Sequence, residues 1–347
     1  MKKFLIKVFV FVFLIACLII PVNYLVDPYN VFHADKIRDN GIEPNKNYIK
    51  TKYIIENGEK YDSYLFGSSR VGFIDVDAIS KITGERFYNM MYSEGLPAEN
   101  LNTLKAMIKR GEIPKTVMLG VDDISYLVDP MLHEKQLFRM AFPYDGNLSN
   151  KVSFYLKYMD TYTTMQSIRT TNAYKNDEKQ EKMSDLSQLY TNGCENLNLE
   201  LTFDENANIP YWADYYKERI PECIKEIGQI KELCDEYQIR LIVFTNPIHY
   251  TTYSKDVRHE YLLFLEELAK VVPYYNFSGY NGVTLNNANY FETSHYKPIV
   301  GEKITSAIFE EKIDDALKSQ GFGYYVTPDS FSELLKILEN QRDSIAQ

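Results

Sequence analysis

The sequence predicts an α/β fold in which a doubly wound, parallel sheet carries helices on both faces. Short apolar runs that are typical of buried strands alternate with helical patterns along most of the 347 residues. The run "KTVMLGV" at 115–121 is apolar almost throughout, as expected of a parallel strand that is buried on both faces. A long apolar segment at the N-terminus stands apart from this alternation.

The expected elements follow one another in the order strand, helix, strand. Strands are predicted at 61–67, 86–91, 115–121, 239–245 and 273–278. Helices are predicted at 75–84, 96–111, 214–238, 259–272, 296–313 and 327–344. Gly84 and Gly111 fit the ends of the first two helices, and Pro97 fits a first helical turn.

Residues 128–212 interrupt the alternation. This stretch is polar and irregular, and its apolar residues are mostly Tyr, Phe and Met. We interpret it as an inserted irregular or helical cap over a site, with a loose surface excursion as the alternative. The predicted organisation is therefore an anchor at 1–27, an α/β domain formed by 28–127 and 213–347, and an insertion at 128–212.

The N-terminal segment predicts a single membrane-spanning helix. Lys2, Lys3 and Lys7 precede or open an apolar run that reaches Val26, and about 20 apolar residues span a bilayer. Lysines before the run favour a cytoplasmic N-terminus and an extracytoplasmic remainder, at the cell membrane. A lipoprotein signal ending at Cys17 and a cleaved signal peptide are the alternatives. The apolar residues that continue past Cys17 favour an uncleaved anchor.

Charge and cysteine usage exclude several classes of protein. The net charge is -10 and no run of Lys or Arg is present, so no nucleic-acid partner is expected, and membrane lipid is expected to contact only the N-terminal helix. Cys223 and Cys234 lie about three turns apart on one predicted helix, too far to form a disulfide. A disulfide of Cys194 stays open. No metal-binding spacing is present, and neither a metal nor a diffusible cofactor is expected.

The stretch "YLFGSSRVGF" at 64–73 places Gly67, Ser68 and Ser69 where the first strand ends. Carboxyl ends of parallel strands form the ligand-binding edge of such sheets. A serine at this turn exposes its hydroxyl, and its own N–H together with the next helix favours an oxyanion. A plain turn or an anion-binding nest is the alternative.

One of the five histidines has a carboxylate at a useful spacing. In "NYFETSHYKPIVGEKI", Glu292 precedes His295 by three residues in a predicted loop. A carboxylate there can hold the imidazole Nδ1–H and orient the ring as a general base. A helix-capping segment whose histidine packs on aromatic rings is the alternative.

Together these segments resemble the SGNH (GDSL-type) hydrolase superfamily over 61–125 and 239–312. The resemblance implies Ser69 as nucleophile, His295 as base and Glu292, in place of the usual Asp, as the orienting acid, with Ser68 where the family has Asp. It also implies an oxyanion hole formed by Ser69, Gly95 and position 122. Asp122 stands where the family has Asn, and an ionised Asp cannot donate to an oxyanion.

A narrower resemblance rests on "NYLVDPYNVF", "LFGSSR", "LGVDDISY", "FTNPIH" and "FETSHYKPIVGEKI". These segments are similar to bacterial membrane-anchored proteins related to the D-alanine transfer proteins of teichoic acid and to alginate O-acetylation proteins. The resemblance implies an acyltransferase or esterase that works beside a membrane-bound O-acyltransferase on a cell-surface polysaccharide or teichoic acid. Ser68, Arg70, Asn246 and His249 are expected to line the substrate cleft. A deacylating esterase of glycans or lipids and a non-catalytic accessory subunit are the alternatives.

Overall fold

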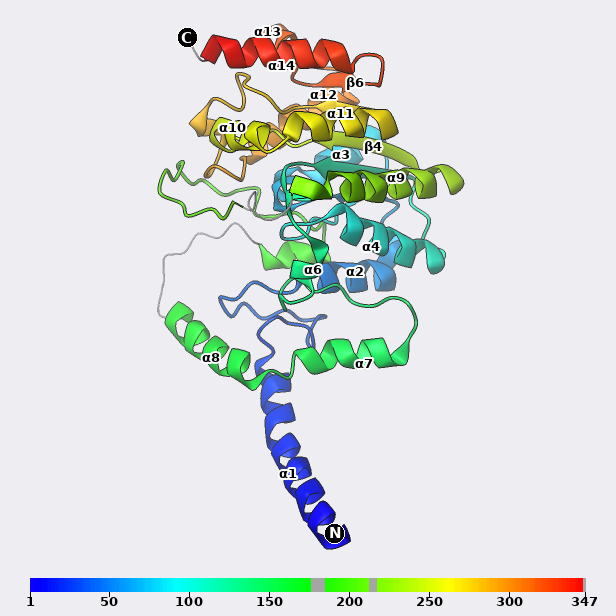
Figure 1. Ribbon diagram of the computed structural model, residues 1–347, viewed down its shortest axis with the longest axis vertical. Helices are drawn as coiled ribbons and strands as arrows, with labels where there is room; N and C mark the ends of the chain where they lie inside the picture. Colours follow the sequence, from blue (N-terminus) through cyan, green and yellow to red (C-terminus); the bar gives the residue numbers. More distant parts are fainter. Residues whose placement is uncertain (176–184, 212–216, 346–347) are drawn as a thin grey trace. The chain divides into compact units, whose positions relative to one another are not determined.

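A computed structural model describes residues 1–175, 185–211 and 217–345 (Figure 1). These residues form two compact units. Residues 53–132, 185–211 and 217–345 make up what we call the α/β unit. Residues 1–52 and 133–175 make up the N-terminal unit, which contains the apolar N-terminal helix.

The described part of the α/β unit contains a six-stranded sheet of order β2-β1-β3-β4-β5-β6. The first five strands pair in parallel, whereas β6 runs antiparallel to β5. The chain is therefore a mixed α/β protein with a mostly parallel sheet, as predicted, and β6 is an addition to the prediction. The strands are β1 (Ser63–Phe66), β2 (Phe87–Asn89), β3 (Thr116–Val121), β4 (Arg240–Thr245), β5 (Tyr274–Asn276) and β6 (Tyr324–Val326).

Helices cover both faces of this sheet, because alternate residues of each strand point to opposite sides. On β3, Val117, Leu119 and Val121 join one apolar cluster, and Met118 joins the other. The first cluster includes residues of α4 (Pro97–Lys109), α9 (Ile220–Glu236), α11 (Tyr261–Val271) and α14 (Phe331–Ile345), which lie one above another in Figure 1. The second cluster includes residues of α3 (Val76–Thr83) and α12 (Pro298–Phe309).

The predicted helices are all present, with shifted ends. The helix predicted at 214–238 begins at Ile220, and Pro221 occupies its first turn, where proline is favoured. Gly84 ends α3 in a left-handed conformation at φ 75°. The lead-in segment 27–60, which reads from the sequence as a loop and a short helix, contains α2 (Lys46–Asn57). Elements absent from the prediction are α5 (Ile124–Leu127), α6 (Pro130–His133), α10 (Tyr250–Arg258) and α13 (Asp315–Ser319).

The stretch predicted as one insertion is divided between the two units. Residues 133–175 belong to the N-terminal unit and include α7 (Leu148–Lys157) and α8 (Thr161–Lys175). Residues 185–211 belong to the α/β unit, where the Glu195 N–H donates to the Gly72 carbonyl at 2.8 Å and Phe203 stacks on His249. Residues 176–184 and 212 of the predicted insertion lie outside the described residues.

In the N-terminal unit, α1 (Lys2–Val26) is long and apolar enough to cross a membrane. Asp27 ends the helix in a left-handed conformation at φ 40°, with its side chain buried. Its carboxylate accepts hydrogen bonds from the backbone N–H groups of Val31, Phe32 and His33 at 2.8 to 2.9 Å. The His33 ring lies 3.0 Å from the same carboxylate. The first turn after the apolar helix is therefore tightly closed.

Candidate active site

The turn after β1 requires a glycine. Gly67 has φ +152°, and a Cβ there would lie 2.8 Å from the carbonyl oxygen of Gly120 and 2.9 Å from the Val71 side chain. A residue with a side chain would therefore push β1 away from β3. The chain then enters a short 3₁₀ turn, Ser69–Phe73, whose first residue is Ser69.

This turn brings Ser69 to His295, although 226 positions separate the two residues along the chain. The Ser69 hydroxyl oxygen lies 2.7 Å from His295 Nε2. The other ring nitrogen, Nδ1, contacts the Glu292 carboxylate. An ionised carboxylate only accepts hydrogen bonds, so Nδ1 carries the ring proton and Nε2 can accept the proton of Ser69. The geometry is that of a nucleophile, a base and an orienting acid.

The loop that carries Glu292 and His295 is held closed by its own backbone. The Phe291 N–H donates to the His295 carbonyl at 2.9 Å, and Tyr290 pairs with Tyr296 in an antiparallel bridge. From outside the loop, the Thr252 hydroxyl donates to the Thr293 carbonyl at 2.8 Å. The spacing of three residues therefore becomes a fixed side-chain pair.

Glu292 is held in its ionised form. Burial raises the pKa of its carboxyl. The His295 ring and the Ser294 N–H, both bonded to the carboxylate, lower the pKa by more than burial raises it, so the pKa lies below its ordinary value. Its side chain is 6% exposed, whereas the His295 side chain is 20% exposed. Reagents from solvent can therefore reach the base, while the orienting acid is shielded.

Arg70, the residue after Ser69, turns into the protein instead of toward solvent. Its side chain is 2% exposed, and its guanidinium contacts Asp123 and lies 3.1 Å from Asp122. Its Nε donates to the Ser294 carbonyl at 2.9 Å. Arg70 therefore ties the turn that carries Ser69, which we call the nucleophile turn after its proposed role, to the loop that carries His295 and to the end of β3. We call Arg70, Asp122 and Asp123 the arginine cluster.

The side chain of Asp122 acts as an acceptor toward the donors around it. Its carboxylate accepts from the Ser68 hydroxyl at 2.7 Å, from Asn246 Nδ2 at 3.1 Å and from the Ile124 N–H at 3.1 Å. The oxygens of Asp122 are therefore occupied by these donors and by Arg70. Ser68, Arg70 and Asn246 were expected to contact substrate, but all three are buried and hold Asp122 in place.

Gly95 is also engaged elsewhere than at an oxyanion. Its N–H donates to the Tyr92 carbonyl at 3.0 Å. A Cβ at this position would overlap the Gly67 carbonyl oxygen, so a glycine lets this loop approach the nucleophile turn. Of the three predicted donors, the Ser69 N–H remains, because it has no acceptor within residues 1–175, 185–211 and 217–345.

His249 caps a helix. Its Nδ1 accepts from the Thr251 N–H, in the first turn of α10, at 3.3 Å. Its Nε2 lies 3.0 Å from the Asn287 side-chain oxygen. Burial lowers the pKa of the His249 ring, so that the neutral form is favoured. Both ring nitrogens of His249 thus have partners within the protein, and its place in a substrate cleft stays a prediction.

Three residues near the site were absent from the prediction: Asp123, Ser294 and Asp256. The adjacent acids "DD" after β3 were a signal for a basic partner, and Arg70 is that partner. Asp256 on α10 accepts from the Tyr211 hydroxyl at 2.7 Å. Burial, followed by the nearby Asp123, raises the pKa of Asp256 well above its ordinary value, so this acid is expected to stay protonated beside the arginine cluster.

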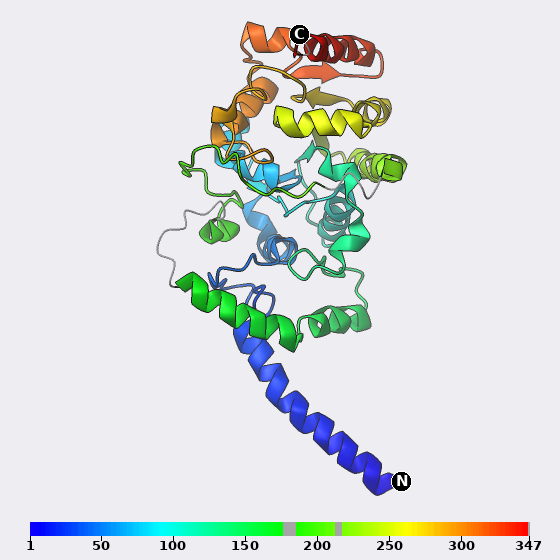
Figure 2. The ribbon, with the colours of Figure 1, turned by 60° about the vertical axis from the view of Figure 1, so that its left-hand side comes forward.

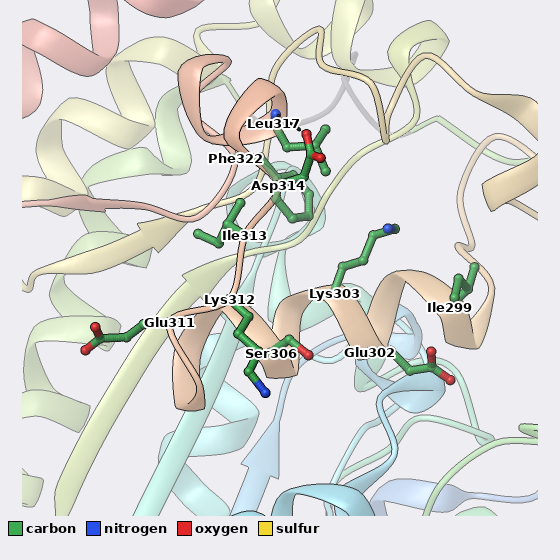
Figure 3. Close-up of a pocket in the computed structure, with 10 residues that line it drawn as sticks. All are labelled: Ile299, Glu302, Lys303, Ser306, Glu311, Lys312, Ile313, Asp314, Leu317 and Phe322. Carbon is green, nitrogen blue, oxygen red and sulfur yellow. Dashed lines mark hydrogen bonds between the residues drawn. The ribbon is translucent and has the colours of Figure 1, made fainter.

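A pocket of about 500 Å³ lies elsewhere, along α12 and the segment that follows it (Figure 3). Lys303, Lys312, Glu302 and Asp314 are among its lining residues, so its charges are mixed, and none of the Ser69 group lines it. Within the described residues, no group of three or more His, Cys, Asp or Glu side chains is arranged to hold a metal ion.

Comparison with known proteins adds no relative. No protein-family model matches the chain, and a search of curated proteins finds no match. The chemistry of the site therefore rests on its own residues.

Proposed function

We propose that this chain is a membrane-anchored, SGNH-type acyl-transfer protein whose domain lies outside the cytoplasm. The observation that carries the proposal is the distance of 2.7 Å between the Ser69 hydroxyl and His295 Nε2, with Glu292 on the opposite ring nitrogen. A serine becomes a nucleophile when a neutral imidazole stands ready to take its proton.

The proposed reaction has two halves. In the first, Ser69 Oγ attacks the carbonyl carbon of an acyl donor while His295 Nε2 takes the hydroxyl proton, and the negative charge collects on the former carbonyl oxygen. The Ser69 N–H, which has no acceptor among the described residues, would stabilise this oxyanion. The leaving group departs with the proton from His295, and an ester on Ser69 remains.

In the second half, a hydroxyl of the acceptor attacks this ester. His295 removes the hydroxyl proton and returns it to Ser69 as the ester bond breaks. Glu292 stays ionised and stabilises the imidazolium that forms in both halves. A sugar or teichoic-acid hydroxyl gives transfer to a cell-surface polymer, and water gives hydrolysis. The resemblance favours the polymer, with a membrane-bound O-acyltransferase as the source of the acyl group.

One observation favours a second candidate, a non-catalytic accessory subunit. Asp122 and Gly95 supply no donor to an oxyanion, and the loss of one such donor typically costs about 10²- to 10³-fold in rate. An accessory would use the fold to bind the acyltransferase or the polymer.

The test is labelling of the full chain in detergent with a fluorophosphonate, which modifies activated serines, followed by peptide mapping. We expect label on Ser69, and its loss in His295→Ala. Glu302→Gln, an exposed acid on α12, is a matched control that should label normally. A folded chain that takes no label would rule out the acyl-transfer proposal and leave the accessory role. Incubation of an acylated chain with water alone or with a glycan then separates hydrolysis from transfer.

A further inference from the structure

Helix α8 has its polar and apolar faces reversed relative to a helix of a water-soluble protein. Thr164 and Ser167 form its buried face, at 1% and 5% exposure. Tyr162, Met165 and Ile168, at 72%, 56% and 39% exposure, lie together on the outer face. Residues three apart share a side of a helix, so these three form a continuous apolar stripe.

The buried face of α8 packs against α1, near the end of the apolar helix. The Thr164 hydroxyl donates to the side-chain oxygen of Asn23, the one residue of α1 that is fully buried. The residues of α1 around Asn23 stay exposed, including Val22, Tyr24 and Leu25. The apolar surface of α1 and the apolar stripe of α8 are therefore close neighbours.

Helix α7 carries a second stripe. Leu148, Val152 and Leu156 are spaced four residues apart, on one side of the helix, and are 74%, 48% and 62% exposed. The opposite side packs into the aromatic cluster of the N-terminal unit through Phe154 and Tyr158. Burial on one side therefore does not account for the apolar residues on the other.

The charge of this region is opposite to that of the chain. Residues 148–172 contain Lys151, Lys157 and Arg169 but a single acid, Asp160. Asp160 accepts from the N–H groups of Tyr162 and Thr163 and so caps α8. The chain as a whole has a net charge of -10. A local excess of basic residues beside exposed apolar residues is the pattern of helices that lie in the headgroup region of a bilayer.

Figures 1 and 2 show α8 beside the C-terminal end of α1, and Figure 1 shows α7 turned away from the direction of α1. A helix that spans a bilayer along α1 would leave it at this end. Helices beside this exit point would lie at the level of the lipid headgroups.

We infer that α7 and α8 are interfacial helices, whose exposed apolar stripes insert between lipid headgroups and whose basic residues bind anionic lipid phosphates. The occupant is lipid and not a second copy of this chain, because a second copy would bring the same excess of basic residues to the contact. The apolar stripe of α8 also lies next to the exposed apolar surface of α1, and lipid that contacts α1 would therefore contact α8 as well. This inference does not depend on the reaction at Ser69.

The test places an environment-sensitive fluorophore on the stripes in the full chain. A Cys17→Ser background removes the exposed cysteine, and the other three cysteines are buried. Val152→Cys and Met165→Cys are labelled with NBD, and the chain is reconstituted into vesicles of phosphatidylcholine and phosphatidylglycerol. Some vesicles contain lipid with a nitroxide near the headgroup. Ser153→Cys and Gln166→Cys are exposed polar positions on the same helices and serve as matched controls.

We expect the two stripe positions to show blue-shifted emission and to lose most of it to the nitroxide lipid. The controls should be quenched much less. Replacing phosphatidylglycerol by phosphatidylcholine should weaken the quenching, because the basic residues lose their partners. Water-like emission at both stripe positions would overturn the inference. A blue shift without lipid quenching would also overturn it, since protein would then cover the stripes.

Discussion

Two groups of side chains beside the nucleophile turn differ in what they are built to do. In the group of Ser69, His295 and Glu292, the His295 side chain is 20% exposed, whereas the side chains of Arg70, Asp122 and Asp123 are at most 5% exposed. The two groups meet at three consecutive residues. Ser68 and Arg70 contact Asp122, whereas Ser69 contacts His295. Within this short stretch, the middle residue belongs to the group proposed to react, and the residues on either side of it belong to the group that holds the turn in place.

The largest expected effect is on activity alone. Ser69→Ala removes the proposed nucleophile, so cleavage of an activated ester should fall about 10⁴-fold or more. The hydroxyl is half-buried and has one partner, so the free energy of unfolding should change by less than about 1 kcal/mol. Ester cleavage and urea unfolding measure the two effects. Retained ester cleavage would move the reaction away from Ser69.

Arg70→Met should act in the opposite way, on stability first. It leaves Asp122 and Asp123 buried without their counter-charge, which typically costs about 3–5 kcal/mol. The urea midpoint measures this loss. The matched control is Lys115→Met, which removes an ion pair of an exposed lysine with Asp62 and should cost less than about 1 kcal/mol. Equal losses in the two variants would contradict the structural role of the arginine cluster.

Glu292→Gln lies between these two cases. The amide keeps an acceptor for His295 but lacks the charge that stabilises the imidazolium, so the rate of ester cleavage should fall about 10²- to 10⁴-fold. Glu302→Gln, at an exposed position of α12, should leave the rate unchanged. If the two variants react equally fast, Glu292 does not orient the base.

The smallest expected effect separates two buried acids by the sign of their pH dependence. The raised pKa of Asp256 means that the folded chain binds its proton more tightly, so this acid makes stability fall as pH rises from about 4, the ordinary carboxyl value, through its folded pKa. The lowered pKa of Glu292 acts oppositely, because its stabilisation is lost as pH falls through its folded pKa.

Asp256→Asn should therefore remove the first dependence and leave the second. Unfolding free energies across this pH range should lose a slope of at most about 1.4 kcal/mol per pH unit. Asp235→Asn, an exposed acid at the end of α9, should leave the slope nearly unchanged. An unchanged slope in Asp256→Asn would mean that Asp256 is ionised in the folded chain.

The sequence predicts the α/β unit well because its strands and helices carry the pattern that burial imposes. β3 is apolar on both faces, and α3 ends at a glycine, so local sequence and final structure agree. β6 is three residues long and is half-exposed, so it lacks such a pattern. Helix α8 could not be predicted from such a pattern, because its apolar residues face outward and its buried residues are Thr and Ser.

The site shows the same division. The pairing of Glu292 with His295 was predictable from their spacing of three residues, whereas the approach of Ser69 to His295 was an expectation from the family resemblance. The destination of Arg70 was not, because a basic residue beside a serine can equally face a ligand or a buried acid. Only the positions of Asp122 and Asp123 at the end of β3 decide this, and the pairing depends on tertiary structure.

The closed turn at Asp27 has a mechanical consequence. The Asp27 carboxylate is bound by three backbone N–H groups and by the His33 ring, all from the residues that directly follow α1. Arg38 also donates to the Leu25 carbonyl at 2.7 Å. A glycine- or serine-rich leash at this point would let the residues beyond it swing and spin freely. Here a rigid turn joins α1 to the residues that follow it. A twist or tilt of α1 within the bilayer would be passed on as torque to the residues that follow.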